Sequence, residues 1–234
     1  MYKNETSIKK REKKNHLLGI PFSNIDLQTA LNLVGEILDQ TIHSNLFFIN
    51  AHCINTSYSN IEYKKALQKA SIIFPDGSGV SYACKMLGGS LTENLNGTDL
   101  FPHFCSLFSE KNKSIYLLGA KPGTVERLEE WIENHYPSLN VVGKQHGYFP
   151  DSKTDAIIDQ INQSGADILF VAFGVPKQEI WISQNEHKLN TILNIAVGGL
   201  FDFYGKNVSR APFFMRKLGI EWIWRLIQEP TRMW

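Results

Sequence analysis

A carboxylate follows a short apolar run in the stretch SIIFPDGSGV, residues 71–80. An apolar run of this length, closed by Pro-Asp-Gly, is typical of a buried strand that ends at a turn. Asp76 would then lie where a strand leaves the core, beside a glycine that permits a tight turn. A carboxylate in that place can take a proton as a general base, or it can bond its own backbone in an Asx turn. Because turn aspartates are common, the residues alone favour the second interpretation and leave the first open.

Small and polar residues recur where the other apolar runs end. They are Asn50 after FFI, GAKPG after IYLL, HGYF after LNVVGKQ, FGVPKQ after ILFVA and GGLFD after NIAV. Ligands of open α/β sheets bind beyond the carboxyl ends of the strands, so these loops are the candidate site. The stretch LLGAKPGTVE also fits a phosphate at a helix N-terminus, although glycine turns occur in any α/β fold. It is neither a P-loop nor the dinucleotide fingerprint, because Gly119 and Gly123 lack the required spacing.

The elements that must position these loops alternate along the chain. Strands are predicted at 17–23, 45–51, 71–74, 114–120, 139–145, 166–174 and 191–199. Helices are predicted from about 27 to 38 and at 53–69, 78–87, 123–136, 153–165 and 177–189. This order indicates a doubly wound, Rossmann-like α/β fold whose mostly parallel sheet is covered on both faces. Right-handed crossovers would bring the strand carboxyl ends to one edge.

The chain divides into three segments. Residues 1–16 form a polar, basic tail that we expect to be disordered. Residues 17–211 form the α/β domain, and residues 212–234 form an apolar and basic helical extension. The extension is too apolar for an exposed helix, so we expect it to dock on the domain, on a sister subunit or at a membrane interface. A homo-oligomer therefore stays open.

Composition and charge exclude several classes of protein. The chain has 234 residues, 43% of them hydrophobic and 20% charged, with a formal net charge of +1, so nothing favours a nucleic acid partner. The three cysteines are scattered, which argues against disulfides and zinc, and the sequence has no Asp-x-Asp pair for a divalent metal. We expect neither a metal nor a cofactor. The sequence also lacks a bilayer-spanning stretch and a signal peptide, which predicts a cytoplasmic protein.

Five ordered segments together resemble the WecG/TagA/CpsF family of glycosyltransferases from about Leu17 to the end of the chain. They are PDGSGV, NGTD, FGVPKQEIW, VGGLFDFYGKNVSRAP and LGIEWIWRLIQEPTR. The resemblance implies an inverting, metal-independent enzyme of bacterial capsule, teichoic acid or other surface polysaccharide synthesis. Such an enzyme moves N-acetylmannosamine, or its uronic acid, from UDP to undecaprenyl-diphosphate-linked N-acetylglucosamine. It acts at the inner face of the cytoplasmic membrane.

The resemblance also assigns roles to residues of this sequence. Asp76 becomes the catalytic base, and Asn50 lies beside it to orient the acceptor or the carboxylate. The donor-binding residues are Gly119, Tyr148, Gln178, Gly198, Gly199 and Asp202. The residues for the acceptor or the diphosphate are Asn96, Thr98, Asp99, Arg210, Arg225 and Arg232. Structural alternatives stay open for these residues: a core tyrosine, a solvated helix glutamine, sharp glycine turns and helix caps.

The sequence departs from the family pattern at Phe48, where many members carry threonine two residues before Asn50. A hydroxyl contact is therefore absent, and the donor or acceptor can differ. Many members also continue with basic residues beyond the position of Trp234, which puts the strength of membrane attachment in doubt. Two other classes stay open: a non-catalytic nucleotide-binding module of a polymer-assembly complex, and a dinucleotide-dependent oxidoreductase, against which the missing glycine fingerprint argues.

Overall fold

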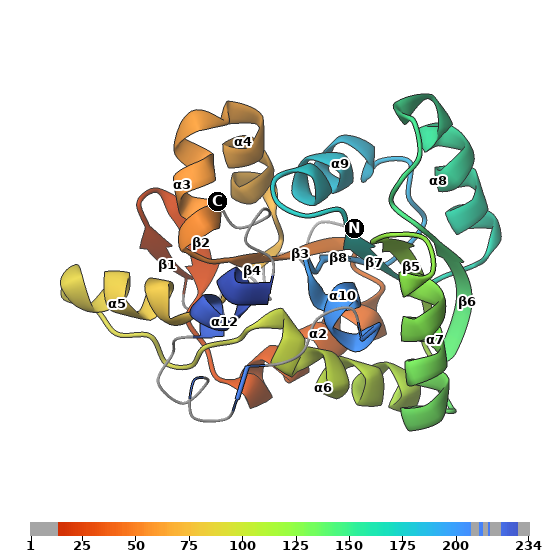
Figure 1. The fold of residues 1–234 in the computed structure, drawn as a ribbon, viewed down its shortest axis with the longest axis horizontal. Coiled ribbons are helices and arrows are strands. Elements are labelled where there is room, and N and C mark those ends of the chain that lie inside the picture. Colours follow the sequence, from red (N-terminus) through yellow and green to blue (C-terminus); the bar gives the residue numbers. More distant parts are fainter. Residues whose placement is uncertain (1–13, 207–210, 213–214, 216–220, 229–234) are drawn as a thin grey trace.

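A six-stranded, all-parallel sheet forms the centre of the computed structural model, which describes residues 14–206, 211–212, 215 and 221–228 (Figure 1). Its strand order is β4-β3-β8-β7-β5-β6. The strands are β3 (Ser44–Ile49), β4 (Ile72–Pro75), β5 (Ser114–Gly119), β6 (Asn140–Gln145), β7 (Ile168–Ala172) and β8 (Leu193–Ala196). The predicted parallel, Rossmann-like α/β sheet is confirmed.

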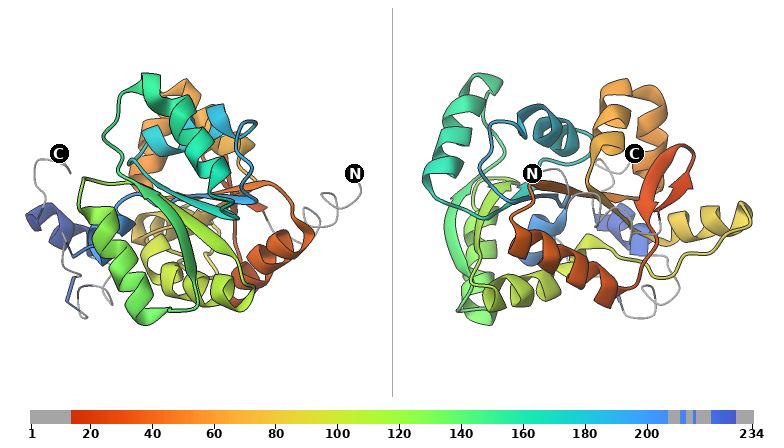
Figure 2. Two further views of the ribbon diagram at one scale, coloured as in Figure 1. Left: turned by 90° about the vertical axis from the view of Figure 1, so that its right-hand side faces the viewer. Right: turned by 180° about the vertical axis from the view of Figure 1, so that it is seen from behind.

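Two layers of helices cover the sheet, and the left view of Figure 2 shows the sheet between them. One layer contains α2 (Leu27–Gln40), α6 (Gly97–Glu110), α7 (Thr124–His135) and α10 (Leu200–Tyr204). The other contains α3 (Ala51–Ser59), α4 (Ile61–Lys69), α5 (Ser78–Met86), α8 (Thr154–Gln163) and α9 (Lys177–Asn185). The short helix η1 (Asp151–Lys153) precedes α8. This is the two-sided cover that a parallel sheet requires.

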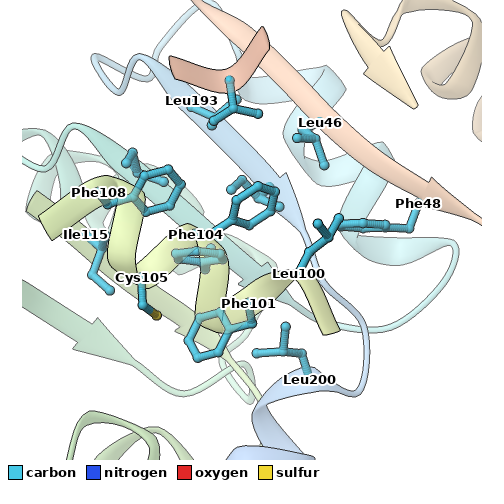
Figure 3. Packing of buried hydrophobic residues seen from close by; sticks show 14 of the residues in the cluster. Leu46, Phe48, Leu100, Phe101, Phe104, Cys105, Phe108, Ile115, Leu193 and Leu200 are labelled. Carbon is cyan, nitrogen blue, oxygen red and sulfur yellow. The ribbon is translucent and has the colours of Figure 1, made fainter. Parts of the chain in front are cut away.

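The strands separate two hydrophobic cores because successive side chains point to opposite faces. Phe48 and Phe74 belong to the core beneath α2 and α6, whereas Phe47 and Ile73 belong to the core beneath α3 and α4. Figure 3 shows the first core, where Phe101, Phe104 and Phe108 of α6 pack against the sheet. These continuous apolar runs are what identified the strands in the sequence.

The strand order contains a switch point that gathers loops from both halves of the chain. The chain passes from β3 outward to β4, then crosses to β5 and β6, and returns through β7 to β8. β8 therefore lies beside β3, with Leu46 opposite Ile195. Because all six strands are parallel, their carboxyl ends share one edge, where ligands of such sheets bind.

Several elements differ from the predictions, among them α6, for which no helix range was predicted. The strand predicted at 17–23 is an antiparallel hairpin of β1 (Lys14–Leu17) and β2 (Ile20–Ser23), because Leu18 and Gly19 have positive φ angles of 52° and 83°. The basic tail predicted to extend to residue 16 therefore ends earlier, since β1 already begins at Lys14. The single helix predicted at 53–69 is two helices. The Asn60 side chain accepts from Tyr63 N at 2.9 Å and starts the second helix.

Part of the C-terminal extension is helical, as predicted. Helix α12 (Glu221–Gln228) lies in it, and the left view of Figure 2 places this helix at the outer rim of the side where α10 lies. Within the described residues, no helix is long and apolar enough to cross a membrane.

Candidate active site

Asp76 and Asn50 lie side by side at the carboxyl edge of the sheet. They directly follow β4 and β3, whose last residues, Pro75 and Ile49, are opposite each other in the parallel ladder. The Asp76 N–H extends this ladder by donating to the Ile49 carbonyl at 2.7 Å. Both side chains are partly exposed. The predicted proximity of these two residues is confirmed. A carboxylate and an amide therefore lie next to each other at the carboxyl edge of the sheet.

A return loop secures the main chain around Asp76. Gly77 has a φ of 90°, which favours glycine, and its N–H donates to Asn94 Oδ1 at 2.6 Å. One residue later, the Leu95 N–H donates to the Pro75 carbonyl at 3.0 Å. Residues 76–95 therefore leave and rejoin the sheet at the same strand end. Asn94 was not identified from the sequence, because its partner is distant along the chain.

Asn50 has a structural partner as well as a place in the site. Its Oδ1 accepts from Cys53 N at 3.0 Å and caps α3. An N-cap asparagine retains its NH2 group as a donor that can point away from the helix. The cap therefore fixes the position of Asn50 without using the amide donors.

The ends of β5, β6 and β7 are tied together by main-chain hydrogen bonds. Ala120 N donates to the Ala172 carbonyl, and Gly147 N donates to the Ala120 carbonyl, both at 2.9 Å. Gly119 has a φ of 138°, and a Cβ there would lie 2.6 Å from the Ala172 carbonyl carbon. Glycine is thus required for this close approach, which keeps the loop between β5 and α7 next to the end of β7.

Gln178 is buried beneath two neighbouring loops. Its Oε1 accepts from Gly174 N at 3.2 Å and from Gly198 N at 3.0 Å, so it bridges the loops after β7 and β8. Its Nε2 donates to Glu179 Oε1 at 2.8 Å. The alternative of a solvated helix glutamine is wrong, because Gln178 is 3% exposed. The predicted contact of this amide with the donor stays a prediction.

Glu179 is a buried acid that sequence reasoning did not identify. The residue is fully buried. Burial raises the pKa of its carboxyl to about 7, although the hydrogen bond from Gln178 alone would lower this pKa. Its neighbours Lys177 and Gln178 are polar, so the local sequence gives no sign of burial. Only the packing of α4 against α9 reveals its burial.

The remaining donor-side residues lie around the same edge. Tyr148 is 64% exposed, so the alternative of a core tyrosine is wrong, and its ring is available for stacking. Gly198 has a φ of 58° and makes the sharp turn, whereas Gly199, with a φ of −81°, is the N-cap of α10. Asp202 is partly buried in the first turn of α10. Their contacts with a donor stay predictions.

The acceptor-side residues include a helix cap. Asn96 Oδ1 accepts from Asp99 N at 2.9 Å, and Asn96 Nδ2 donates to Asp99 Oδ2 at 2.7 Å, which starts α6. The Thr98 carbonyl accepts from the Tyr204 hydroxyl at 2.8 Å. The capping interpretation of NGTD is confirmed. Arg210 and Arg232 lie outside the described residues, as does the side chain of Arg225 in α12.

Phe48 points into a hydrophobic core. It is 8% exposed and packs against the start of α6, where a Cβ on Gly97 would lie 3.3 Å from its ring (Figure 3). The phenylalanine therefore fills space between β3 and α6. Its effect on donor or acceptor choice can only be indirect, through the position of Gly97 and the cap beside it.

Two lysines at the carboxyl edge carry positive charge that the sequence analysis did not use. Lys121 and Lys177 are exposed and follow β5 and β7. Lys177 Nζ lies 5.5 Å from the centre of the Phe173 ring. Their signal in the sequence was a lysine within each strand-end loop. Among the described residues, no group of three or more His, Cys, Asp or Glu could hold a metal ion.

A cavity of about 250 Å³ lies at the opposite, amino edge of the sheet. Its lining includes His43, Asn45, Glu186, His187 and Asn194. Asn194 Nδ2 donates to Asn45 Oδ1 at 3.0 Å, and Asn45 Nδ2 donates to Glu186. Asn194, Asn45 and Glu186 are thus joined by hydrogen bonds at this edge. Ligands of parallel sheets bind at the carboxyl edge, which remains the candidate site.

Comparison with known proteins identifies the family of this chain. The sequence model described as "Glycosyl transferase WecG/TagA/CpsF family" matches residues 15–234. A Bacillus subtilis (strain 168) protein is 31% identical over 214 residues, which cover 91% of this chain and 83% of that protein. A Staphylococcus aureus (strain MW2) protein is 28% identical over 222 residues, covering 94% of this chain and 87% of that protein. Both relatives are named N-acetylglucosaminyldiphosphoundecaprenol N-acetyl-beta-D-mannosaminyltransferase.

Proposed function

The chain belongs to the WecG/TagA/CpsF family of glycosyltransferases, and we propose that it transfers N-acetylmannosamine, or its uronic acid, from a UDP-sugar to a polyprenyl-diphosphate-linked N-acetylglucosamine. The sugar and the acceptor follow from the names of the relatives, which span most of this chain. The placement of Asp76 beside Asn50 at the carboxyl edge is the observation that carries the proposal. Family membership sets aside the non-catalytic module and the oxidoreductase.

Asp76 acts as the general base in the proposed reaction. Its carboxylate takes the proton from the acceptor hydroxyl while that oxygen forms a bond to the anomeric carbon of the donor sugar. The bond from the anomeric carbon to the UDP oxygen breaks on the opposite face, so the configuration inverts. Asn50, held by its cap of α3, orients the acceptor hydroxyl or the carboxylate through its NH2 group.

The departing diphosphate needs positive charge and hydrogen-bond donors, because its negative charge increases as the bond breaks. Lys121 lies in the loop after β5, directly before α7, and Lys177 is the first residue of α9 on the donor side. The N-terminus of a helix also favours a phosphate group. Arg210, Arg225 and Arg232 of the C-terminal part supply further charge. No metal is required in this scheme.

The donor nucleotide occupies the loops after β5 to β8. Tyr148 stacks on the uracil, and Asp202 contacts the nucleotide from the first turn of α10. Gly198 and Gly199 keep the main chain small enough for a ligand to approach. Gly119 contributes by letting the loop after β5 approach Ala172 at the end of β7. Gln178 supports this wall by holding the Gly174 and Gly198 amides.

Contact with a membrane surface follows from the lipid-linked acceptor. The outer side of α5 exposes Tyr82, Met86 and Leu87, while Lys85 is the only charged residue of that helix. Figures 1 and 2 show α5 projecting from the body of the molecule. The helix begins two residues after Asp76, so an apolar tip with a cation continues from the site. Together with residues 212–234, it would hold the enzyme at the inner face of the cytoplasmic membrane.

Two experiments test the proposed function. Thermal unfolding is measured with UDP, GDP, CMP or NAD at equal concentration. A ligand at about one hundred times its dissociation constant stabilises by roughly 2.7 kcal/mol, which gives a shift of several degrees for UDP alone. Transfer is then measured from UDP-N-acetylmannosamine to a polyprenyl-diphosphate-linked N-acetylglucosamine, with and without EDTA. Turnover that EDTA does not change supports the proposal, whereas a shift with NAD alone contradicts it.

A further inference from the structure

We infer that Glu179 is a positioning residue of the donor site, which orients the Gln178 amide so that this amide holds the loops after β7 and β8 in place. The inference rests on the proposed function only in taking these two loops as the donor side. Glu179 itself lies beneath the loops and reaches a ligand only through Gln178.

The orientation of the Gln178 amide decides whether the two loops are held. The N–H groups of Gly174 and Gly198 both donate to Oε1, at 3.2 and 3.0 Å. If the amide were flipped, its NH2 group would face two N–H donors with no acceptor between them. Both loop amides would then lose their hydrogen-bond acceptor. The Gln178 side chain therefore holds the two loops in only one of its two amide orientations.

Glu179 selects that orientation. Its Oε1 accepts from Gln178 Nε2 at 2.8 Å, and the carboxyl is fully buried on α9. A carboxyl oxygen next to the amide is compatible with the NH2 group and repels the amide oxygen. A leucine of similar size would pack in the same space without any preference between the two orientations.

The rest of the local structure does not explain why an acid is buried here. Glu179 Oε2 and Trp181 Nε1 are buried without a hydrogen-bond partner in the described part of the chain. Burying such groups is costly, and native structures contain few of them. Burial is the main cause that raises the pKa of the Cys53 thiol, and the charges of Glu179 and Asp76 raise it further. Helix α9, which carries Glu179, packs against β3 and α4, so the acid lies behind the strand that Asn50 follows. This location is next to the site, as a positioning role requires.

Amide exchange tests the inference without any ligand. In Glu179→Leu, we expect the Gly174 and Gly198 amides to exchange about tenfold faster, as after the loss of one hydrogen bond. In Glu179→Gln, the amide oxygen can still accept from Gln178, so exchange should stay near that of the native protein. Ile182→Val is the control, because it removes a buried methylene group from the same helix and leaves Gln178 and its hydrogen-bond partners in place. Unchanged exchange in folded Glu179→Leu would overturn the inference.

A swapped pair gives a second test. Gln178→Glu alone places two carboxyls against each other, whereas the double variant Gln178→Glu/Glu179→Gln restores one donor facing one acceptor. We expect the single variant to weaken UDP binding about tenfold or more and the double variant to recover most of the loss. No recovery, together with unaltered loop exchange, would contradict a positioning role. If the native enzyme does not bind UDP, the proposed function fails while the exchange test still decides the role of Glu179.

Discussion

At the amino edge of the sheet, Asn45, Thr191 and Asn194 hydrogen-bond to one another, whereas at the carboxyl edge Asn50 and Gln178 bond to the main chain of loops and helix starts. The amino-edge groups are buried and complete one another's bonding. The carboxyl-edge groups hold a wall of loops, several with left-handed glycines, around the partly exposed Asp76. Similar residue types therefore stabilise the fold at the amino edge and position the loops of the candidate site at the carboxyl edge.

The largest expected difference between the two edges is catalytic. Asp76→Asn removes the proposed base but keeps the size and most of the bonding of the side chain. Transfer should fall about 10²- to 10⁴-fold, as on the loss of a general base, while UDP binding stays nearly native. Steady-state turnover and a titration with UDP measure the two effects. Full activity in Asp76→Asn would show that the carboxyl edge has another base.

A substitution at the amino edge should lower the stability of the protein. Asn194→Leu leaves Asn45 Oδ1 without its donor and Thr191 Oγ1 without its acceptor. Each buried group left in this way costs about 1–3 kcal/mol, so the free energy of unfolding should fall by a few kcal/mol. Urea unfolding measures this loss. UDP affinity of the folded protein should not change, and a large change in affinity at native stability would break the comparison.

A pH effect should come from Glu179 at the carboxyl edge. Its pKa is raised from 4.5 to about 7, so the folded state binds more protons than the unfolded state between these values. The contribution of this group to stability is therefore complete below about pH 4.5 and is lost as the pH rises to about 7, by roughly 3 kcal/mol. Glu179→Gln should flatten this dependence. Unfolding free energies from pH 5 to 8 compare the two proteins, and parallel curves would contradict the assignment.

The smallest effect should concern the exposed apolar tip beside the site. Met86→Glu/Leu87→Glu should reduce sedimentation with anionic vesicles several-fold, because two charges replace apolar side chains at an interface. Tyr58→Glu/Ile61→Glu is the control, since these residues are similarly exposed but belong to the α3–α4 region. Deletion of residues 218–234 tests the C-terminal part separately. Equal losses in the tip variant and its control would argue against a specific role of α5.

Local patterns predicted much of the fold. The apolar runs ending at Ile49, Pro75 and Ala172 are strands at the expected places, and the alternation with helices gave the parallel sheet. The hairpin at Leu18 and Gly19 and the helix break at Asn60 were missed. These breaks depend on single turn or cap residues, whose effect is weaker than the hydrophobic pattern that surrounds them.

The sequence by itself determined the family through several short motifs, and it determined that Asp76 and Asn50 follow strands. Each of these signals lies within a short stretch of the chain. Only the tertiary structure decided that Phe48 fills a core, that Gln178 bridges two loops and that Glu179 is buried beneath them. The burial of Glu179 depends on α9 packing against α4, which is more than one hundred residues away in sequence. The packing of Phe48 depends on α6, and the bridge made by Gln178 depends on β7 and β8 being neighbours in the sheet. Local periodicity does not specify such distant contacts, since the same helix pattern fits either an exposed or a buried acid until its neighbours are in place.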